Sequence, residues 1–180
     1  MENFIEEIVL SNEEIVRVCE CIGKEITKEY ENKNPLVVGL LKGSVPFMAE
    51  LIKHIKCDIE IDFMEVSSYI GTNSTGAVTI LKDVRADIRG RDLILVEDIV
   101  DTGLTIQEVI NFLNSRGARS IEIATLLDKP AGRTVKCQTP KYIGATIEPK
   151  FVVGFGLDYN QKYRNLPYVG VLKRWVYENR

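Results

Sequence analysis

The sequence predicts an α/β domain with a mostly parallel central sheet flanked by helices. Two observations carry this prediction. Short, β-branched apolar runs alternate along the chain with amphipathic helical patterns. The runs are also apolar throughout, rather than at every second residue, as is typical of strands that are buried on both faces. In such a sheet ligands bind beyond the carboxyl ends of the strands, so the loops at those ends are where function is expected.

Composition narrows the class of protein further. The 180 residues are 45% hydrophobic and 27% charged, which suits a single domain over residues 1–180. A formal net charge of -3 argues against a nucleic acid partner, and one histidine, His54, disfavours histidine metal chemistry. The four cysteines form no C-x-x-C pair, and no leader peptide or membrane-spanning stretch is recognised. We therefore expect a cytoplasmic protein with reduced thiols and no membrane association.

The first third of the chain predicts a helix, a strand and a second helix. Ser11 and Glu14 have capping-box spacing, and the apolar residues after them predict a helix that runs to about Tyr30. The run at 35–41 predicts a strand buried on both faces. Apolar residues at helical spacing over 45–55 predict the helix that follows it.

A hairpin is expected next. Residues 57–69 alternate in polarity, and the run 77–81 predicts a partner strand. One side of the first strand is expected to carry Ile59, Ile61 and Phe63. The connection between the strands has no large apolar side chain to anchor it, so the segment of about 67–82 is expected to be mobile and could act as a lid.

The second half of the chain continues the alternation. Residues 93–96 form the clearest central strand, and apolar residues over 106–113 predict a helix that Gly117 closes. Further strands are expected at 121–127, 151–153 and 168–172. The C-terminal segment around Trp175 and Tyr177 could pack at an interface between copies or against its own domain.

An acidic loop follows the strand at 93–96. Its sequence, VEDIVDTGLT over 96–105, holds three carboxylates, those of Glu97, Asp98 and Asp101. One interpretation is that Asp101 or Thr102 caps the next helix and the other acids are solvated. Clustered acids repel each other unless cations or hydroxyl donors offset them, so a magnesium-bound polyol phosphate is a natural ligand. Backbone amides at the helix start would then cradle the phosphate.

Five ordered segments resemble those of the type I phosphoribosyltransferases, and more narrowly the hypoxanthine-guanine phosphoribosyltransferase family. They are LLKGS (40–44), SSY (67–69), VEDIVDTGLT (96–105), the 129–133 stretch and KFVVGFGLDYNQKYRNLPYVG (150–170). The resemblance covers nearly the whole chain and implies the type I phosphoribosyltransferase fold, with a small hood and a mobile hairpin lid. It implies purine salvage, in which 5-phosphoribosyl passes from phosphoribosyl diphosphate to hypoxanthine or guanine, giving IMP or GMP and diphosphate.

The resemblance also implies a role for each matching residue. Asp101 would be the catalytic proton acceptor and donor for the purine. The ribose and 5'-phosphate would be bound by Glu97, Asp98, Asp101, Thr102, Gly103, Leu104 and Thr105, and the diphosphate by Lys42, Gly43 and Arg164. The purine would be bound by Ile99, Lys129, Phe151 and Val152, the lid would begin at Ser68 and Tyr69, and Mg²⁺ would be engaged by Glu97, Asp98 and Asp158. The resemblance further implies an unusual peptide conformation in the diphosphate loop at Lys42 and Gly43.

Several alternatives stay open. Lysine has only hydrogen-bond donors, so Lys129 favours a 6-oxopurine over adenine, but a preference for xanthine remains compatible with the sequence. A non-catalytic regulator that senses phosphoribosyl diphosphate would be expected to carry a basic face or an added nucleic-acid module, for which this chain has little room. Neither a P-loop nor a G-x-G-x-x-G pattern is present. The family commonly forms homodimers or homotetramers, and we expect one of these.

Overall fold

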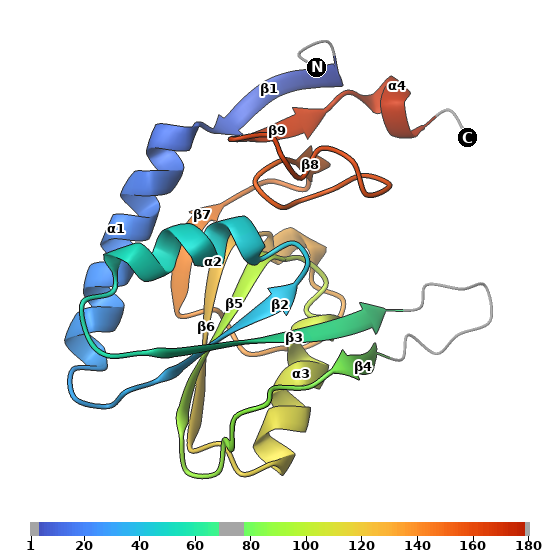
Figure 1. Ribbon diagram of the computed structural model, residues 1–180. Coiled ribbons are helices and arrows are strands. Elements are labelled where there is room, and N and C mark those ends of the chain that lie inside the picture. The colour runs from blue at the N-terminus through green and yellow to red at the C-terminus, as the bar shows by residue number, and fades with distance from the viewer. Residues whose placement is uncertain (1–3, 69–77, 179–180) are drawn as a thin grey trace.

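The computed structural model describes residues 4–68 and 78–178, which form two sheets and their helices (Figure 1). The strands are β1 (Ile5–Leu10), β2 (Leu36–Leu41), β3 (Glu60–Ser68), β4 (Val78–Lys82), β5 (Asp92–Val100), β6 (Ser120–Asp128), β7 (Tyr142–Thr146), β8 (Val152–Val153) and β9 (Val169–Leu172). The helices are α1 (Asn12–Glu29), α2 (Val45–Leu51), α3 (Leu104–Ser115) and α4 (Arg174–Tyr177), with 3₁₀ turns at Ile52–His54 and Pro130–Gly132.

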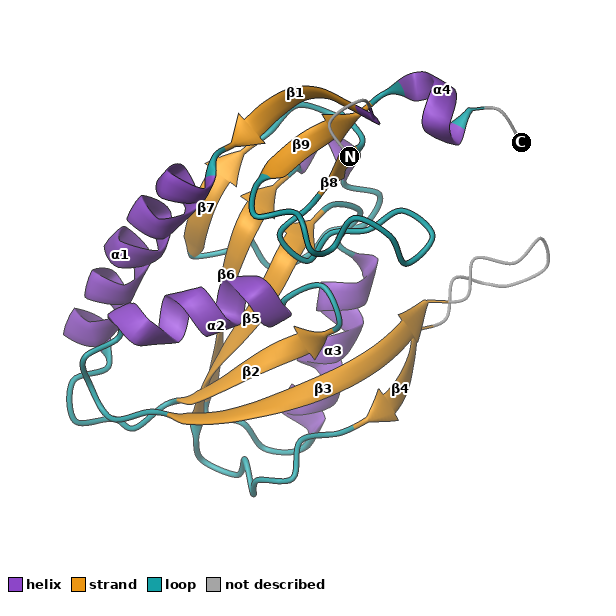
Figure 2. Cartoon of the chain, turned by 45° about the horizontal axis from the view of Figure 1, so that its top comes forward, coloured by secondary structure: helices purple, strands orange, loops and turns teal. Residues whose placement is uncertain are grey.

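The larger sheet has six strands in the order β4-β3-β2-β5-β6-β7, and all neighbours are parallel except β3 and β4. Helices α1 and α2 cover one face and α3 covers the other (Figure 2). In β5, Ile94 and Val96 pack with the α1 side, whereas Leu93 and Leu95 pack with the α3 side. This two-sided burial is the physical reason for the uninterrupted apolar run, and it confirms the predicted mostly parallel sheet.

Helix α1 begins as the sequence predicts. The Ser11 hydroxyl accepts a hydrogen bond from the Glu14 amide, and the Glu14 carboxylate accepts one from the Ser11 amide over 2.7 Å. Tyr30 is the C-terminal cap. Helix α2 ends at Leu51, whereas the sequence predicts a helix over 45–55. The last turn of that range, which includes His54, is a 3₁₀ turn.

Two predictions about strands are wrong in detail. Strand β5 does not end at Val96 but continues to Val100, so Glu97 and Asp98 lie on a strand and not in a loop. Ile59 and Phe63 pack against the core as expected, but Ile61 is 51% exposed, and Met64 on the opposite side is fully buried. Strand β3 therefore contributes to both faces of the sheet.

The smaller sheet is the hood, which has the order β1-β9-β8 with antiparallel pairs. It stands over the carboxyl-terminal ends of β5 and β6 (Figures 1 and 2). The sequence analysis assigned no strand to β1 or β7. Strand β1 is mostly exposed and acidic, and β7 is an edge strand, so neither has the buried apolar run that marks the central strands.

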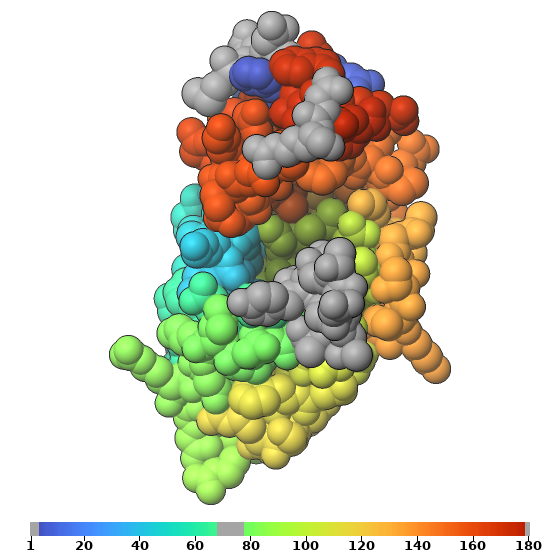
Figure 3. Space-filling view, turned by 90° about the vertical axis from the view of Figure 1, so that its right-hand side faces the viewer, coloured from blue at the N-terminus to red at the C-terminus, as the bar shows by residue number. Residues whose placement is uncertain are grey.

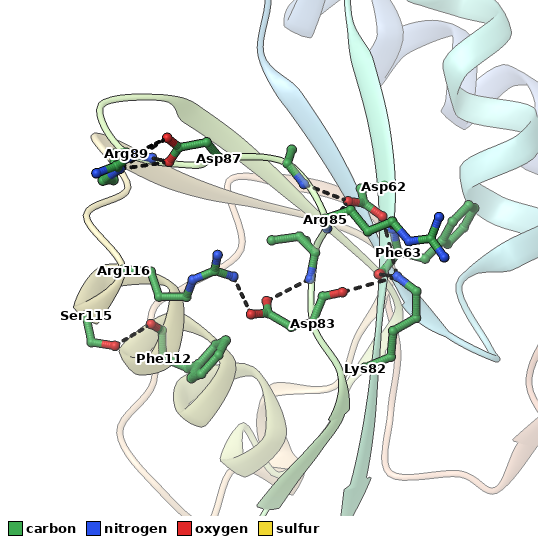
Figure 4. A network of polar contacts seen from close by, with 12 residues as sticks. Asp62, Phe63, Lys82, Asp83, Arg85, Asp87, Arg89, Phe112, Ser115 and Arg116 are labelled. Atoms are coloured by element: carbon green, nitrogen blue, oxygen red, sulfur yellow. Dashed lines mark hydrogen bonds and ion pairs between the residues drawn. The ribbon is translucent and has the colours of Figure 1, made fainter.

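Strands β3 and β4 form the predicted antiparallel hairpin. Residues 69–77 between them, including Tyr69 of the expected lid, lie outside the described residues. In the segment after β4, the backbone N–H of Arg85 donates to the Asp62 carboxylate of β3 over 2.6 Å, and Asp83 forms an ion pair with Arg116, the C-terminal cap of α3 (Figure 4). This polar network ties the returning chain to β3 and α3. Within residues 4–68 and 78–178, no helix is long and apolar enough to cross a membrane.

Candidate active site

The ends of three parallel strands converge beneath the hood. Lys42 and Gly43 follow β2, Asp101 follows β5, and Lys129 follows β6. The space-filling view shows a hollow in the surface between the hood and the sheet on this side (Figure 3). The ends of neighbouring parallel strands meet at one edge of a sheet, so these residues come together although up to 87 positions separate them in the chain.

The two acids of β5 are positioned by strand pairing. Pairing of β5 with β2 ends at Val96, but its pairing with β6 continues to Val100, which lies opposite Asp128. Glu97 and Asp98 therefore project from a part of β5 that extends past β2 toward the hood. A strand holds its side chains in fixed alternating directions, which a flexible loop would not do.

Gly43 is closely approached by the Asp98 side chain and by the backbone at Gly156. A Cβ atom on Gly43 would lie 1.7 Å from Oδ2 of Asp98. Gly156, which has a φ of +102°, approaches from the loop between β8 and β9, and a Cβ there would lie 1.9 Å from the Gly43 carbonyl oxygen. The peptide between Leu41 and Lys42 is cis. Close approach of three chain segments requires glycine at both positions.

The carboxyl groups of Glu97 and Asp98, which are partly buried, resist ionisation. Burial raises the pKa of Glu97 well above its ordinary value, and the neighbouring charge of Asp98 raises it further. Burial also raises the pKa of Asp98, to about 6, although the hydrogen bond from the Ile99 amide and the charge of Arg164 oppose this shift. A cation or a hydroxyl donor bound here would favour the ionised carboxylates.

Asp101 contacts Lys129 and not the helix start. Nζ of Lys129 lies 2.7 Å from Oδ2 of Asp101, and a Cβ atom on Gly132 would lie 1.8 Å from Oδ1. The N-terminal cap of α3 is Gly103, with a φ of +83° and no side-chain cap hydrogen bond, so the capping interpretation of Asp101 is wrong. Thr102 makes one long contact there, 3.4 Å from its Oγ1 to the amide of Leu104.

Arg133 is a residue of the site for which the sequence analysis proposed no role. Its guanidinium donates to the carbonyl oxygens of Val100, Asp101 and Lys129 and forms an ion pair with Asp128. An arginine in a short polar turn carries no local signature of such contacts. The signal that could have found it is its place at the end of the 129–133 stretch, one of the five segments that carry the resemblance.

Arg164 and Asp158 pair within the loop between β8 and β9. The distance from Nη2 of Arg164 to Oδ1 of Asp158 is 2.8 Å, and Nη1 donates to the Gly156 carbonyl over 2.7 Å. The described residues contain no group of three or more His, Cys, Asp or Glu side chains that could hold a metal ion. The expected magnesium ligands Glu97, Asp98 and Asp158 thus do not form a closed protein cage.

Phe151, the aromatic residue that the resemblance assigns to the purine site, directly precedes β8 of the hood. Val152 is buried in β8, and the preceding Phe151 is 39% exposed. The ring of Phe151 stacks on that of Tyr177 in α4, with centroids 4.8 Å apart and an interplanar angle of 21°. Tyr159 meets Phe151 edge-on at 5.7 Å. Tyr177 of the C-terminal segment therefore packs against its own domain.

Known proteins share this architecture and sequence. The family model for the phosphoribosyl transferase domain matches residues 6–160. Hypoxanthine-guanine phosphoribosyltransferase of Lactococcus lactis is 56% identical, with 98% of this chain and 96% of that protein covered. The enzyme of the same name from Streptococcus pneumoniae is 52% identical, with 99% of each covered. A crystal structure of a hypoxanthine phosphoribosyltransferase from Staphylococcus aureus has a TM-score of 0.95 and 48% identity, covering 99% of this chain and 97% of that one. The chain therefore belongs to the phosphoribosyltransferase family, in its hypoxanthine-guanine branch.

Proposed function

We propose that this protein transfers the 5-phosphoribosyl group of phosphoribosyl diphosphate to hypoxanthine or guanine, forming IMP or GMP and releasing diphosphate. This is a reaction of purine salvage, and the names of the similar proteins support it. The observation that carries the proposal is the contact of 2.7 Å between Lys129 and Asp101 at the strand ends. It joins a donor suited to the purine 6-oxygen with an acceptor suited to a purine proton.

The start of α3 supports a site for the 5'-phosphate. Its cap makes no side-chain hydrogen bond, and its first turn contains no acidic residue. Free amides at the positive end of a helix dipole attract an anion. Backbone amides of the segment Asp101, Thr102, Gly103, Leu104 and Thr105 would bind the phosphate, and Glu97 and Asp98 would accept hydrogen bonds from the ribose hydroxyls.

Lys42, Gly43 and Arg164 would bind the diphosphate. The guanidinium fork of Arg164 matches two phosphate oxygens, and Asp158 beside it would keep it oriented. Close packing of Gly43 on Asp98 supports a site in which sugar and diphosphate are neighbours.

Magnesium fits this site as a metal that the substrate carries. Two partly buried carboxyl groups with raised pKa values, Glu97 and Asp98, would be stabilised in their ionised form by a cation. Mg²⁺ is commonly held by one or two carboxylates together with substrate phosphates and water, so a closed protein cage is not required. Glu97 and Asp98 would engage it directly or through the ribose, and Asp158 would order a second ion through water. Bound Mg²⁺ would neutralise charge on the departing diphosphate.

The purine would lie between the hood and β5. Phe151 would stack on one face of the base and Ile99 would pack on the other, with the backbone of Val152 at the base edge. Lys129 would donate to the 6-oxygen, and Asp101 would take the proton from the imidazole ring, which raises the nucleophilicity of the attacking nitrogen. Ser68 and Tyr69 would begin the lid that excludes water.

The test is diphosphate release by the purified protein with Mg²⁺ and phosphoribosyl diphosphate, using hypoxanthine, guanine, xanthine, adenine and uracil in parallel. Turnover with hypoxanthine and guanine is expected. Dominant turnover with xanthine would favour the xanthine-preferring alternative. Binding of phosphoribosyl diphosphate without turnover on any base would overturn the proposal in favour of a regulator.

The resemblance also supports a homodimer or homotetramer that works in the cytoplasm. Sedimentation velocity of the purified protein, with and without phosphoribosyl diphosphate, measures the assembly. A monomer at micromolar concentration would contradict this part of the proposal.

A further inference from the structure

The guanidinium of Arg133 lies at the junction of the two loops that carry the candidate proton acceptor and the candidate purine donor. Its Nη1 donates to the Asp101 carbonyl over 2.6 Å and to the Lys129 carbonyl over 3.3 Å, and it also contacts the Val100 carbonyl. Its Nη2 forms an ion pair with Asp128 at the end of β6. Asp128 is 6% exposed, so this end of the fork is shielded from water.

The segment around Arg133 holds three successive carbonyl groups, which begin with that of Val100 at the end of β5. The Val100 carbonyl accepts from the amide of Lys129 over 3.0 Å as well as from Arg133. The Asp101 carbonyl accepts from Arg133, and the Thr102 carbonyl accepts from the amide of Thr134 over 3.0 Å. The backbone on both sides of the Asp101 side chain is therefore fixed by the segment that also carries Lys129.

We infer that Arg133 is a positioning residue, whose guanidinium sets the geometry of Asp101 relative to Lys129. Its consequence for turnover rests on the proposed function, whereas its consequence for the geometry does not. Arg133 is not a catalytic residue, since its contacts are with backbone carbonyls and Asp128 and not with the side chains of Asp101 or Lys129.

Only a planar group with several fixed donors can make these contacts together. Arginine offers five N–H donors in a rigid fork, whereas lysine offers one ammonium group. A lysine at position 133 could reach Asp128 or the carbonyls, but could not hold both. Misplacement of a reacting group by about 1 Å can lower the rate by about 100-fold.

The experiment uses a double variant and a matched control. Arg133→Met with Asp128→Asn removes the guanidinium without leaving a buried unpaired carboxylate. The control is Arg119→Met with Asp92→Asn, which removes another guanidinium that is paired with a buried carboxylate. Asp92 and Asp128 lie at opposite ends of the same two paired strands, β5 and β6, so the control tests the loss of such a pair away from the site.

For Arg133→Met/Asp128→Asn we expect kcat with hypoxanthine to fall by about 100-fold, while KM for phosphoribosyl diphosphate changes by less than about threefold. The control is expected to keep both constants within about threefold of the unaltered protein. Arg133→Lys is expected to fold as the unaltered protein does. Its kcat is nevertheless expected to be lowered as in the double variant, because lysine cannot make the contacts of the guanidinium. Equal kcat in the double variant and the control, or full kcat in Arg133→Lys, would overturn the inference.

A crystal structure of Arg133→Met/Asp128→Asn separates this inference from the proposed function. We expect the distance between Nζ of Lys129 and Oδ2 of Asp101 to exceed about 4 Å, the limit of an ion pair. Retention of the contact would overturn the inference whatever the activity. Absence of turnover in the unaltered protein would overturn the proposed function alone, and the crystal structure would then decide the role of Arg133.

Discussion

Nζ of Lys129 donates a hydrogen bond to Oδ2 of Asp101 over 2.7 Å, and this contact joins the loops that follow β5 and β6. The Lys129 side chain is 16% exposed and that of Asp101 is 40% exposed, so the carboxylate faces the more open side of the pair. The contact places the proposed purine donor, Lys129, beside the proposed proton acceptor, Asp101.

Asp101→Asn is expected to bind phosphoribosyl diphosphate normally and to lose turnover by about 100-fold or more, because the amide cannot accept a proton from the purine. Calorimetric titration measures the binding, and diphosphate release measures turnover. The amide oxygen can still accept from Lys129, which keeps the local contact. Equal turnover would remove Asp101 from the proton-transfer role.

Lys129→Gln is expected to lower kcat/KM with hypoxanthine by about 100-fold and to raise the ratio of adenine to hypoxanthine use. An amide can donate to an oxygen or accept from an amino group, whereas an ammonium group can only donate. Lys141→Gln is a suitable control, because Lys141 pairs with Glu29 away from the site. An unchanged base ratio would contradict the assignment of Lys129 as the base reader.

Gly43→Ala is expected to reduce the free energy of unfolding by about 1 to 3 kcal/mol, since its Cβ would collide with the Asp98 carboxylate. Removal of that carboxylate with Asp98→Ala should relieve the collision. A double-mutant cycle in urea is therefore expected to show that the two losses are less than additive. Strict additivity would contradict the close contact between Gly43 and Asp98.

Tyr177→Ala is expected to raise KM for the purine by about 2- to 10-fold while leaving KM for phosphoribosyl diphosphate nearly unchanged. An aromatic pair contributes about 0.5 to 1.5 kcal/mol, and the loss of Tyr177 would free the Phe151 ring to move. Trp175→Ala is the matched control, since Trp175 lies in the same short helix and meets Phe4. Equal effects on the two substrates would exclude a role for Tyr177 at the purine.

The stability of the fold should depend on pH through Asp92. Hydrogen bonding with Arg119 lowers the pKa of Asp92 to about 2, below its ordinary value of 3.8. The folded state therefore binds its proton less readily than the unfolded chain, so the stabilisation is present above about pH 4 and is lost as the pH falls toward 2. Asp92→Asn is expected to cost about 1 to 2 kcal/mol at neutral pH, with allowance for solvent screening of the half-exposed Arg119. Urea unfolding at about pH 7 and pH 3 measures this, and a difference that does not shrink at the lower pH would contradict it.

The larger part of the fold could be predicted because its signals are local. Ser11 and Glu14 mark the start of α1 through contacts three residues apart, and the strand at Leu93–Val96 is recognisable from its own composition. Strand β1 escaped prediction since its pairing with β9 joins residues more than 150 positions apart and its side chains are mostly exposed. Strand β5 was predicted to end too early, because Glu97 and Asp98 are polar residues of the kind found in loops. Only the pairing with β6 shows that they belong to the strand.

In the candidate site, too, some features could be predicted from the sequence and others depend on the tertiary structure. The types and order of its residues, such as the acids at 97, 98 and 101, are properties of the chain, and they indicated a magnesium-bound polyol phosphate. The ribose and purine roles were implied by the resemblance of five segments to a known family. The contact of Lys129 with Asp101, the hydrogen bond from Arg133 to the Asp101 carbonyl and the stacking of Tyr177 on Phe151 exist only in the folded molecule. Each joins residues that are 26 to 32 positions apart, and packing of separate strands and loops brings them together, so no local pattern encodes them.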